Sequence, residues 1–199
     1  MDLLNTSKNI LPYDGETKYY GPILDLKEAE NYFSVLLETL PWESDEIFIF
    51  GKRIITKRKV AWFGDEPYQY TYSKSTKTAM PWTEELLELK RLVEKESGET
   101  YNSCLLNLYH SGEEGMGWHT DDEKELKKDG AIASMSLGAE RYFVFKHKES
   151  KETVKVLLQN GSLLIMKGKT QTFWQHRLPP TKKVKTPRIN LTFRTIITA

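Results

Sequence analysis

The second half of the chain is a succession of short extended runs separated by turn residues. Apolar and polar residues alternate within these runs, and Gly, Asn, Asp, Ser or Pro separates most of them. Such alternation is typical of half-buried β-strands, and many short strands in sequence favour a sandwich or a closed barrel. Strands are predicted over residues 47–50, 60–63, 69–72, 103–109, 132–137, 142–146, 153–158, 162–166, 172–175 and 188–195.

Two helices precede most of the strands. The first is predicted from an N-cap at Asp25, with Glu28 in the capping-box position, to about residue 40, where Pro41 follows. The second is predicted from Thr83 to just before Gly98. We find no linker long enough to divide the chain. We therefore predict one domain over 1–199, mainly β with flanking helices on one side, folded as a sandwich or jelly roll.

The composition narrows the class of protein. Hydrophobic residues make up 39% of the chain and the longest clean apolar run is residues 47–50, so a core is expected but no membrane span. The N-terminal residues do not resemble a secretory signal, and the single cysteine, Cys104, rules out an internal disulfide. We expect an intracellular protein, cytoplasmic or, in a eukaryote, nuclear.

Charge is strongly segregated although the net charge is only +1. Residues 47–64 carry five basic side chains and no acid, and residues 153–199 carry nine basic side chains and no acid. Each cationic segment is compatible with a solvated basic face. A phosphate-binding surface assembled from both segments is the sharper interpretation.

The histidines indicate a metal site. His119 and Asp121 are two residues apart, and in extended backbone such residues point to the same side. His176, near the end of a predicted strand, is a candidate third ligand. Two histidines and one carboxylate on one side of an ion form the facial triad of non-haem Fe(II) oxygenases. A single His-x-Asp pair also arises often by chance.

The predicted last strand has two different faces. Ile189, Leu191 and Phe193 alternate with four polar residues: Arg188, Asn190, Thr192 and Arg194. An edge strand with one side in water explains such a pattern. The polar face is also suited to a dicarboxylate, because an arginine grips a carboxylate with two parallel hydrogen bonds. Asn107 and Tyr109 share one face of an earlier strand, so both sets of side chains are candidates to line one cavity.

These residues together resemble the AlkB family of Fe(II)- and 2-oxoglutarate-dependent nucleic-acid dealkylases. The resemblance lies in NLYHSGEEGMGWHTDDE (107–123), IASMSLGAERYFVF (132–145), His176 and PRINLTFR (187–194). It extends from about Ile47 to the end of the chain. It implies a double-stranded β-helix core over 100–199, a nucleotide-recognition lid over 47–80 and an N-terminal helical extension over 1–46.

The resemblance also implies roles for individual residues. His119, Asp121 and His176 match the iron ligands. Arg188, helped by Tyr109, matches the residue that pairs with the distal carboxylate of 2-oxoglutarate. The remaining implied cosubstrate contacts are Arg194 and Asn107 at the end that chelates iron, Thr192 as a further polar contact, and Asn190 on the same face.

Substrate contacts are implied mainly in the lid. The segment Phe50, Gly51 and Lys52 matches the part that approaches the duplex or the target nucleotide, and Tyr70, Thr71 and Tyr72 match the substrate-binding strand, with Tyr72 stacking on a flipped base. Asp122 and Glu123, next to the iron ligand, match contacts to the base. Relatives often carry Pro-Arg where this chain has Lys57-Arg58. We expect these two basic residues, with Lys52 and Arg53, to hold phosphates.

The implied reaction is oxidative demethylation of N1-methyladenine and N3-methylcytosine in DNA, with RNA as an alternative. Fe(II), 2-oxoglutarate and O₂ are required, the chain acts as a monomer, and formaldehyde, succinate and CO₂ are released. Two alternatives stay open at this point. One is the same chemistry on RNA or a protein side chain, and the other is a non-catalytic nucleic-acid-binding module.

Overall fold

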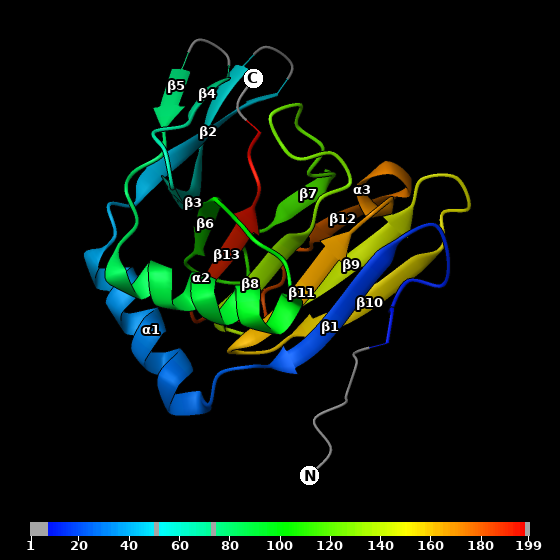
Figure 1. The fold of residues 1–199 in the computed structure, drawn as a ribbon, viewed down its shortest axis with the longest axis horizontal. Helices are drawn as coiled ribbons and strands as arrows, with labels where there is room; N and C mark the ends of the chain where they lie inside the picture. The colour runs from blue at the N-terminus through cyan, green and yellow to red at the C-terminus, as the bar shows by residue number, and fades with distance from the viewer. Residues whose placement is uncertain (1–7, 50–51, 73–74, 198–199) are drawn as a thin grey trace.

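The computed structural model consists mainly of two antiparallel β-sheets that face one another (Figure 1). It describes residues 8–49, 52–72 and 75–197, without the side chains of 46–54 and 70–76. The larger sheet has the strand order β1-β11-β8-β13-β6-β3-β2, and the smaller has the order β10-β9-β12-β7. Strands β4 and β5 pair separately as a hairpin.

The elements follow one another along the chain in this way. They are β1 (Glu16–Pro22), α1 (Leu26–Thr39), β2 (Glu43–Ile49), β3 (Lys52–Gly64), β4 (Gln69–Tyr72), β5 (Ser75–Thr78), α2 (Glu84–Ser97), β6 (Ser103–Tyr109), β7 (Met116–His119), β8 (Ile132–Gly138), β9 (Arg141–His147), β10 (Thr153–Leu158), β11 (Ser162–Lys167), α3 (Thr170–Phe173), β12 (Trp174–Leu178) and β13 (Arg188–Arg194).

Both predicted long helices are present, and their ends are capped as expected. Asp25 and Glu28 form a reciprocal capping box at the start of α1. At the start of α2, Thr83 accepts a hydrogen bond from the Leu86 amide, and Gly98 ends the helix in the left-handed conformation. These caps satisfy amide groups that have no partner within the helix.

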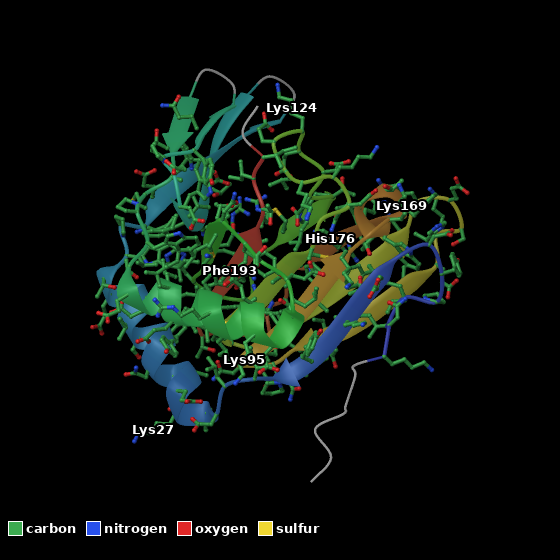
Figure 2. All side chains as sticks on the ribbon, viewed as in Figure 1. Lys27, Lys95, Lys124, Lys169, His176 and Phe193 are labelled. Carbon is green, nitrogen blue, oxygen red and sulfur yellow. The ribbon has the colours of Figure 1, made fainter. Side chains whose placement is uncertain are left out.

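The core has two layers, one on each side of the larger sheet. Outside this sheet, the buried faces of α1 and α2 pack against β6, β8 and β13, and Phe193 lies beneath α2 (Figure 2). Between the two sheets lies a second cluster that includes Phe145, Leu164 and Trp174. The two sheets and the buried layer between them form the jelly-roll fold that the sequence predicts.

Strand β13 is central and not at an edge, because it pairs with β6 on one side and β8 on the other. Ile189, Leu191 and Phe193 belong to the core under the helices. The alternate side chains therefore point into the space between the sheets. This position replaces the edge-strand interpretation of the polar face.

Several parts of the structure differ from the predicted elements, among them β3, which begins at Lys52 and not at residue 60. The segment 1–46 is more than a helical extension, since β1 forms an edge strand of the larger sheet beside β11. The predicted strand at 172–175 is split between the short helix α3 and β12. Strands β1, β5 and β7 were not predicted, because β5 (STKT) has no apolar residue, β7 (MGWH) contains a glycine, and β1 lacks regular alternation. Among the described residues, no helix is long and apolar enough to cross a bilayer.

Candidate active site

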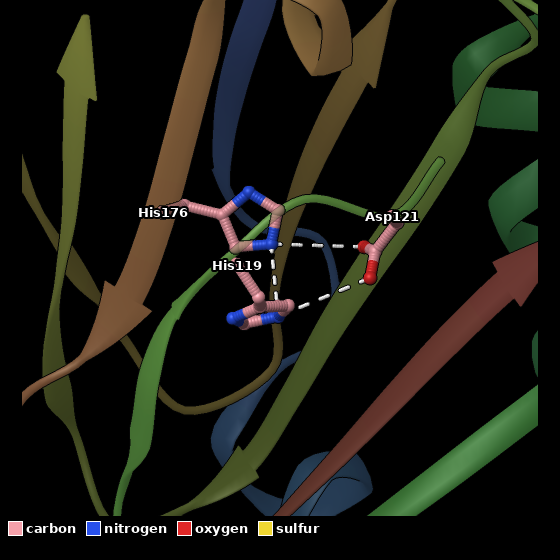
Figure 3. Close-up of side chains that lie close together, drawn as sticks. All are labelled: His119, Asp121 and His176. Atoms are coloured by element: carbon pink, nitrogen blue, oxygen red, sulfur yellow. Dashed lines mark hydrogen bonds and ion pairs between the residues drawn. The ribbon is translucent and has the colours of Figure 1, made fainter. Parts of the chain in front are cut away.

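His119, Asp121 and His176 converge at one point between the sheets (Figure 3). His119 ends β7 and His176 lies in β12, and the register places these two residues directly opposite each other. Their Nε2 atoms are 3.1 Å apart, and the Asp121 carboxylate lies 3.9 Å from His119 Nε2 and 3.7 Å from His176 Nε2. One ligand atom from each residue can thus reach a single ion.

The protonation of the two imidazoles suits a metal. His119 Nδ1 lies 2.8 Å from the Gly117 carbonyl oxygen. A carbonyl only accepts, so Nδ1 donates this hydrogen bond, and Nε2 is the ring atom that faces Asp121 and His176. Burial lowers the pKa of His176 to about 4, an effect that His119 reinforces and Asp121 opposes. His176 is therefore neutral at pH 7 and has a lone pair to offer.

A single cleft of about 1650 Å³ contains this triad and the predicted cosubstrate residues. Asn107 and Tyr109 come from β6, and the neighbouring strand β13 places Asn190 and Arg188 opposite them in register. The cleft is lined by all six side chains: Asn107, Tyr109, Arg188, Asn190, Thr192 and Arg194. The alternation of two adjacent strands thus directs both sets to the same space.

Arg188 places a buried positive charge in the cleft. Its side chain is 2% exposed, it donates to Ser136 Oγ at 2.9 Å, and its guanidinium carbon lies 5.6 Å from the centre of the Tyr109 ring. Burial lowers its pKa to about 10. No carboxylate of the described residues forms an ion pair with it. A buried cation in this state is a strong binding site for an anion.

Two other polar residues of β13, Asn190 and Arg194, have partners in the protein. Arg194 Nη1 lies 3.4 Å from Glu123 Oε1, so the residue predicted to bind the cosubstrate is paired with a residue predicted to contact the base. The Asn190 amide nitrogen donates to Ser134 Oγ and to the Met135 carbonyl, each at 3.0 Å. The amide nitrogen is thus held mainly by β8.

The predicted substrate residues fall into three groups. Glu123 lines the cleft, whereas Asp122 is exposed, accepts a hydrogen bond from Thr120 Oγ1 and does not line it. Phe50 and Gly51 lie outside the described residues. For Lys52, Tyr70, Thr71 and Tyr72 the backbone belongs to β3 and β4, but the side chains lie outside the description.

Arg58 does not occupy a phosphate-binding turn. Residues 57 and 58 lie within the long strand β3, where Lys57 is exposed and Arg58 is buried. Arg58 forms an ion pair with Asp45 of β2 and approaches Met116 Sδ at 3.3 Å, next to the triad. Alternation along a strand places successive side chains on opposite faces. The phosphate role expected for Arg58 is therefore wrong.

Several lining residues were not singled out from the sequence. Phe143 packs its ring 5.1 Å from that of His176, and Asp45 and Met116 also line the cleft. Ser134 and Ser136 hold Asn190 and Arg188 from β8. The two serines are two residues apart within an otherwise apolar strand, and this pattern could have predicted from the sequence that they share one polar face. The Asp45–Arg58 pair has no such local signal, because it joins two strands.

The chain shares its sequence and its fold with known proteins. The profile described as the 2OG-Fe(II) oxygenase superfamily matches residues 17–194. DNA oxidative demethylase ALKBH2 of Bos taurus is 43% identical over 189 residues, which cover 89% of this chain and 68% of that protein. ALKBH2 of Homo sapiens is 38% identical over a region that makes up 89% of this chain and 72% of the human protein. The chain belongs to the AlkB family of 2OG-Fe(II) oxygenases.

Two further comparisons concern relatives that are much longer than this chain and a solved structure with low sequence identity to it. Alpha-ketoglutarate-dependent dioxygenase alkB homolog 3 of Bos taurus is 40% identical over 87% of this chain. The chain spans 63% of the length of that relative and 65% of its Homo sapiens counterpart. The solved structure of OsALKBH1 superposes with a TM-score of 0.62 at 16% identity, over 90% of this chain and 97% of that one, and supports the fold.

Membership of this family implies Fe(II) and 2-oxoglutarate. The residues present fit both groups. The His-Asp-His cluster directs two lone pairs and a carboxylate at one point, and the buried Arg188 lacks an acidic partner among the described residues.

Proposed function

We propose that this protein is an Fe(II)- and 2-oxoglutarate-dependent dioxygenase that demethylates N1-methyladenine and N3-methylcytosine in DNA. One observation carries the proposal: the cleft contains both an open-sided metal triad and a buried arginine without a carboxylate partner. The relatives named DNA oxidative demethylase support the choice of substrate. The protein is further proposed to act as a monomer.

The triad and the polar side chains of β6 and β13 have tasks in this reaction. His119, Asp121 and His176 hold Fe(II), which with O₂ and 2-oxoglutarate supplies the oxidation of the methyl group. Arg188 binds one carboxylate of 2-oxoglutarate beside Tyr109. Arg194 and Asn107 approach the other end, and Thr192 adds a polar contact. The N-hydroxymethyl base then releases formaldehyde, and the cosubstrate ends as succinate and CO₂.

The size and charge of the cleft match a methylated nucleotide. A volume of about 1650 Å³ accommodates more than a small cosubstrate. Glu43, Asp45 and Glu123 line the cleft together with the triad. Both proposed bases carry a positive charge when methylated, which favours contact with Glu43, since Asp45 and Glu123 already pair with Arg58 and Arg194. A methylated base that cannot pair is also less costly to flip out of the duplex.

The segment 47–80 is proposed to be the nucleotide-recognition lid. Its described residues from β3, β5 and the turn before β4 line the same cleft as the triad, which supports a role in holding the target base. Phe50, Gly51 and Lys52 are proposed to approach the strand, and Tyr70, Thr71 and Tyr72 to contact the flipped base. Glu123 is proposed to contact the base from the other side, with Asp122 at the rim.

The experiment that tests this function is product analysis. The protein is incubated with Fe(II), 2-oxoglutarate and O₂ and with DNA and RNA oligonucleotides that contain one methylated base each. A loss of one methyl group from DNA, accompanied by an equal amount of succinate, is the expected result. Succinate formation without any change in the oligonucleotides would reject the substrate, and demethylation confined to RNA would assign the protein to RNA.

Lys57 and Arg58 are neighbours with opposite environments, and their variants should differ. Lys57→Ala removes an exposed cation of the lid, so binding to methylated and unmethylated DNA should weaken alike and the salt slope should fall by about one. Arg58→Ala should instead lower the thermal midpoint, because it removes the buried partner of Asp45 and leaves only the more exposed Lys77 beside that carboxylate. Fluorescence titrations at several salt concentrations and thermal melts measure the two effects. Equal salt slopes for Lys57→Ala and the parent would remove the phosphate role.

Tyr72 is proposed to stack on the flipped base. Tyr72→Ala should weaken engagement of a methylated strand by about 1–3 kcal/mol, the usual range for base–aromatic stacking, with little change in the salt slope. Tyr72→Phe keeps the ring and should retain most of the affinity. The measurement is KM for a methylated oligonucleotide, with succinate formation in the absence of nucleic acid as the control. A Tyr72→Ala variant that repairs as well as the parent would make Tyr72 a packing residue.

A further inference from the structure

The Asp121 backbone lies outside any strand. Strand β7 ends at His119, so Thr120 and Asp121 continue without ladder hydrogen bonds. The Asp121 amide instead donates to the side-chain oxygen Oε1 of Gln171 at 2.9 Å. The amide is a donor, so it requires the oxygen of Gln171, and Gln171 Nε2 is left facing Met166 Sδ at 3.6 Å.

Gln171 belongs to the short helix α3, which continues directly into the strand of the second histidine. Helix α3 ends at Phe173, and β12 begins at Trp174 and contains His176 (Figure 1). The same element therefore holds His176 through the chain and Asp121 through a hydrogen bond. His119 is the neighbour of His176 in the sheet. All three candidate ligands are thus connected to α3 or β12.

Helix α3 is itself fixed on several sides. Thr170 is fully buried, donates to the Glu16 carbonyl at 3.0 Å and accepts from the Glu16 amide at 2.9 Å. Lys148 Nζ donates to the Gln171 carbonyl at 2.9 Å. On the other side, the Gly168 amide donates to the Asp129 carbonyl and Lys169 forms an ion pair with the Asp129 carboxylate. Gln171 is therefore presented from a rigid support.

We propose that Gln171 is a positioning residue of the metal centre, which fixes the turn after β7 so that the Asp121 carboxylate meets His119 and His176. The carboxylate can bind only where its backbone directs it, and Gln171 is the described side chain that holds that backbone. Partners outside the ligand shell orient ligands in this way, and losing one typically weakens metal binding about 10–100-fold. This role rests on the metal centre of the proposed function.

The test is Co(II) binding to the metal-free protein, followed by visible absorption. Gln171→Met has a similar length but no acceptor, and its dissociation constant for Co(II) should rise about 10-fold or more. Gln171→Glu keeps an oxygen in the same place and should bind Co(II) no more weakly than the parent. Thr172→Ala, which changes an exposed side chain on the same turn, is the matched control and should leave Co(II) binding unchanged.

The outcomes separate positioning from packing. Rescue by Gln171→Glu, with thermal midpoints of the metal-free variants close to that of the parent, supports the role. Unchanged Co(II) affinity in Gln171→Met would overturn it. So would equal weakening in Gln171→Met and Gln171→Glu with a lowered thermal midpoint in both, since that result marks a packing residue. If the parent itself bound no Co(II), the metal centre would be rejected, and this role with it.

Discussion

Asp121→Ala should abolish turnover of a methylated oligonucleotide. Asp121 is the only carboxylate in the described His-Asp-His cluster, and it lies within 4 Å of both Nε2 atoms. Without it, two imidazoles remain, which bind a divalent ion far more weakly than a facial triad does. Activity should fall by more than about 100-fold, beyond what the loss of an outer-shell partner typically costs. Succinate and demethylated oligonucleotide are both measured, by mass.

The fold should survive this substitution, because Asp121 is held by its backbone amide and that amide remains in the alanine variant. The thermal midpoint of the metal-free variant checks this point. Glu113→Ala removes an exposed carboxylate that lies outside the cleft, and it serves as the control with unchanged turnover. Near-normal activity of Asp121→Ala with added Fe(II) would show that the assignment of the triad is wrong.

Loss of Arg188 should have the second-largest effect, on the affinity for 2-oxoglutarate. The side chain is buried, and it has no acidic partner among the described residues. The carboxylate of the cosubstrate would therefore supply its anionic partner. Breaking a buried charge pair costs about 3–5 kcal/mol, so Arg188→Met should weaken 2-oxoglutarate binding by at least about 100-fold. Arg188→Lys keeps the charge but loses the planar fork, and its affinity should also fall, by less. Isothermal titration in the presence of the metal measures both.

Arg188→Met weakens the binding of 2-oxoglutarate but should not lower the stability of the protein without 2-oxoglutarate. In the absence of 2-oxoglutarate, Arg188 is a buried cation with a neutral partner, Ser136, and burial opposes its charge. Replacement by a hydrophobic residue of similar size is often neutral or stabilising. Arg188→Met should therefore melt no lower than the parent without 2-oxoglutarate, and it should lose the stabilisation that 2-oxoglutarate gives the parent. Arg177→Met, on the opposite face of β12 from His176, is the control and should bind 2-oxoglutarate normally.

Local patterns in the sequence predicted most of the fold. The caps of α1 and α2 and the bounds of β4, β6 and β10 follow from residues that are close along the chain. Strands β5 and β7 were not predicted because STKT contains no apolar residue and the glycine of MGWH interrupts any alternation. Helix α3 was assigned to a strand because its one turn of Thr, Gln and Phe carries no helical signal, and its position depends on contacts with Glu16, Lys148 and Asp129.

The sequence by itself determined which side chains are available for chemistry and which of them share one face of a strand. His119 and Asp121 are neighbours, and the alternation of β13 separates its arginines from its core residues, because strand geometry acts over a few residues.

Only the tertiary structure decided which of these side chains meet. Pairing of β12 with β7 brings His176 to His119, and the central position of β13 turns a polar face into the wall of a cleft. Arg58 pairs with Asp45 instead of reaching solvent, and Gln171 holds Asp121 across 50 residues of chain. Such contacts join distant segments, and their geometry is set by sheet register and packing.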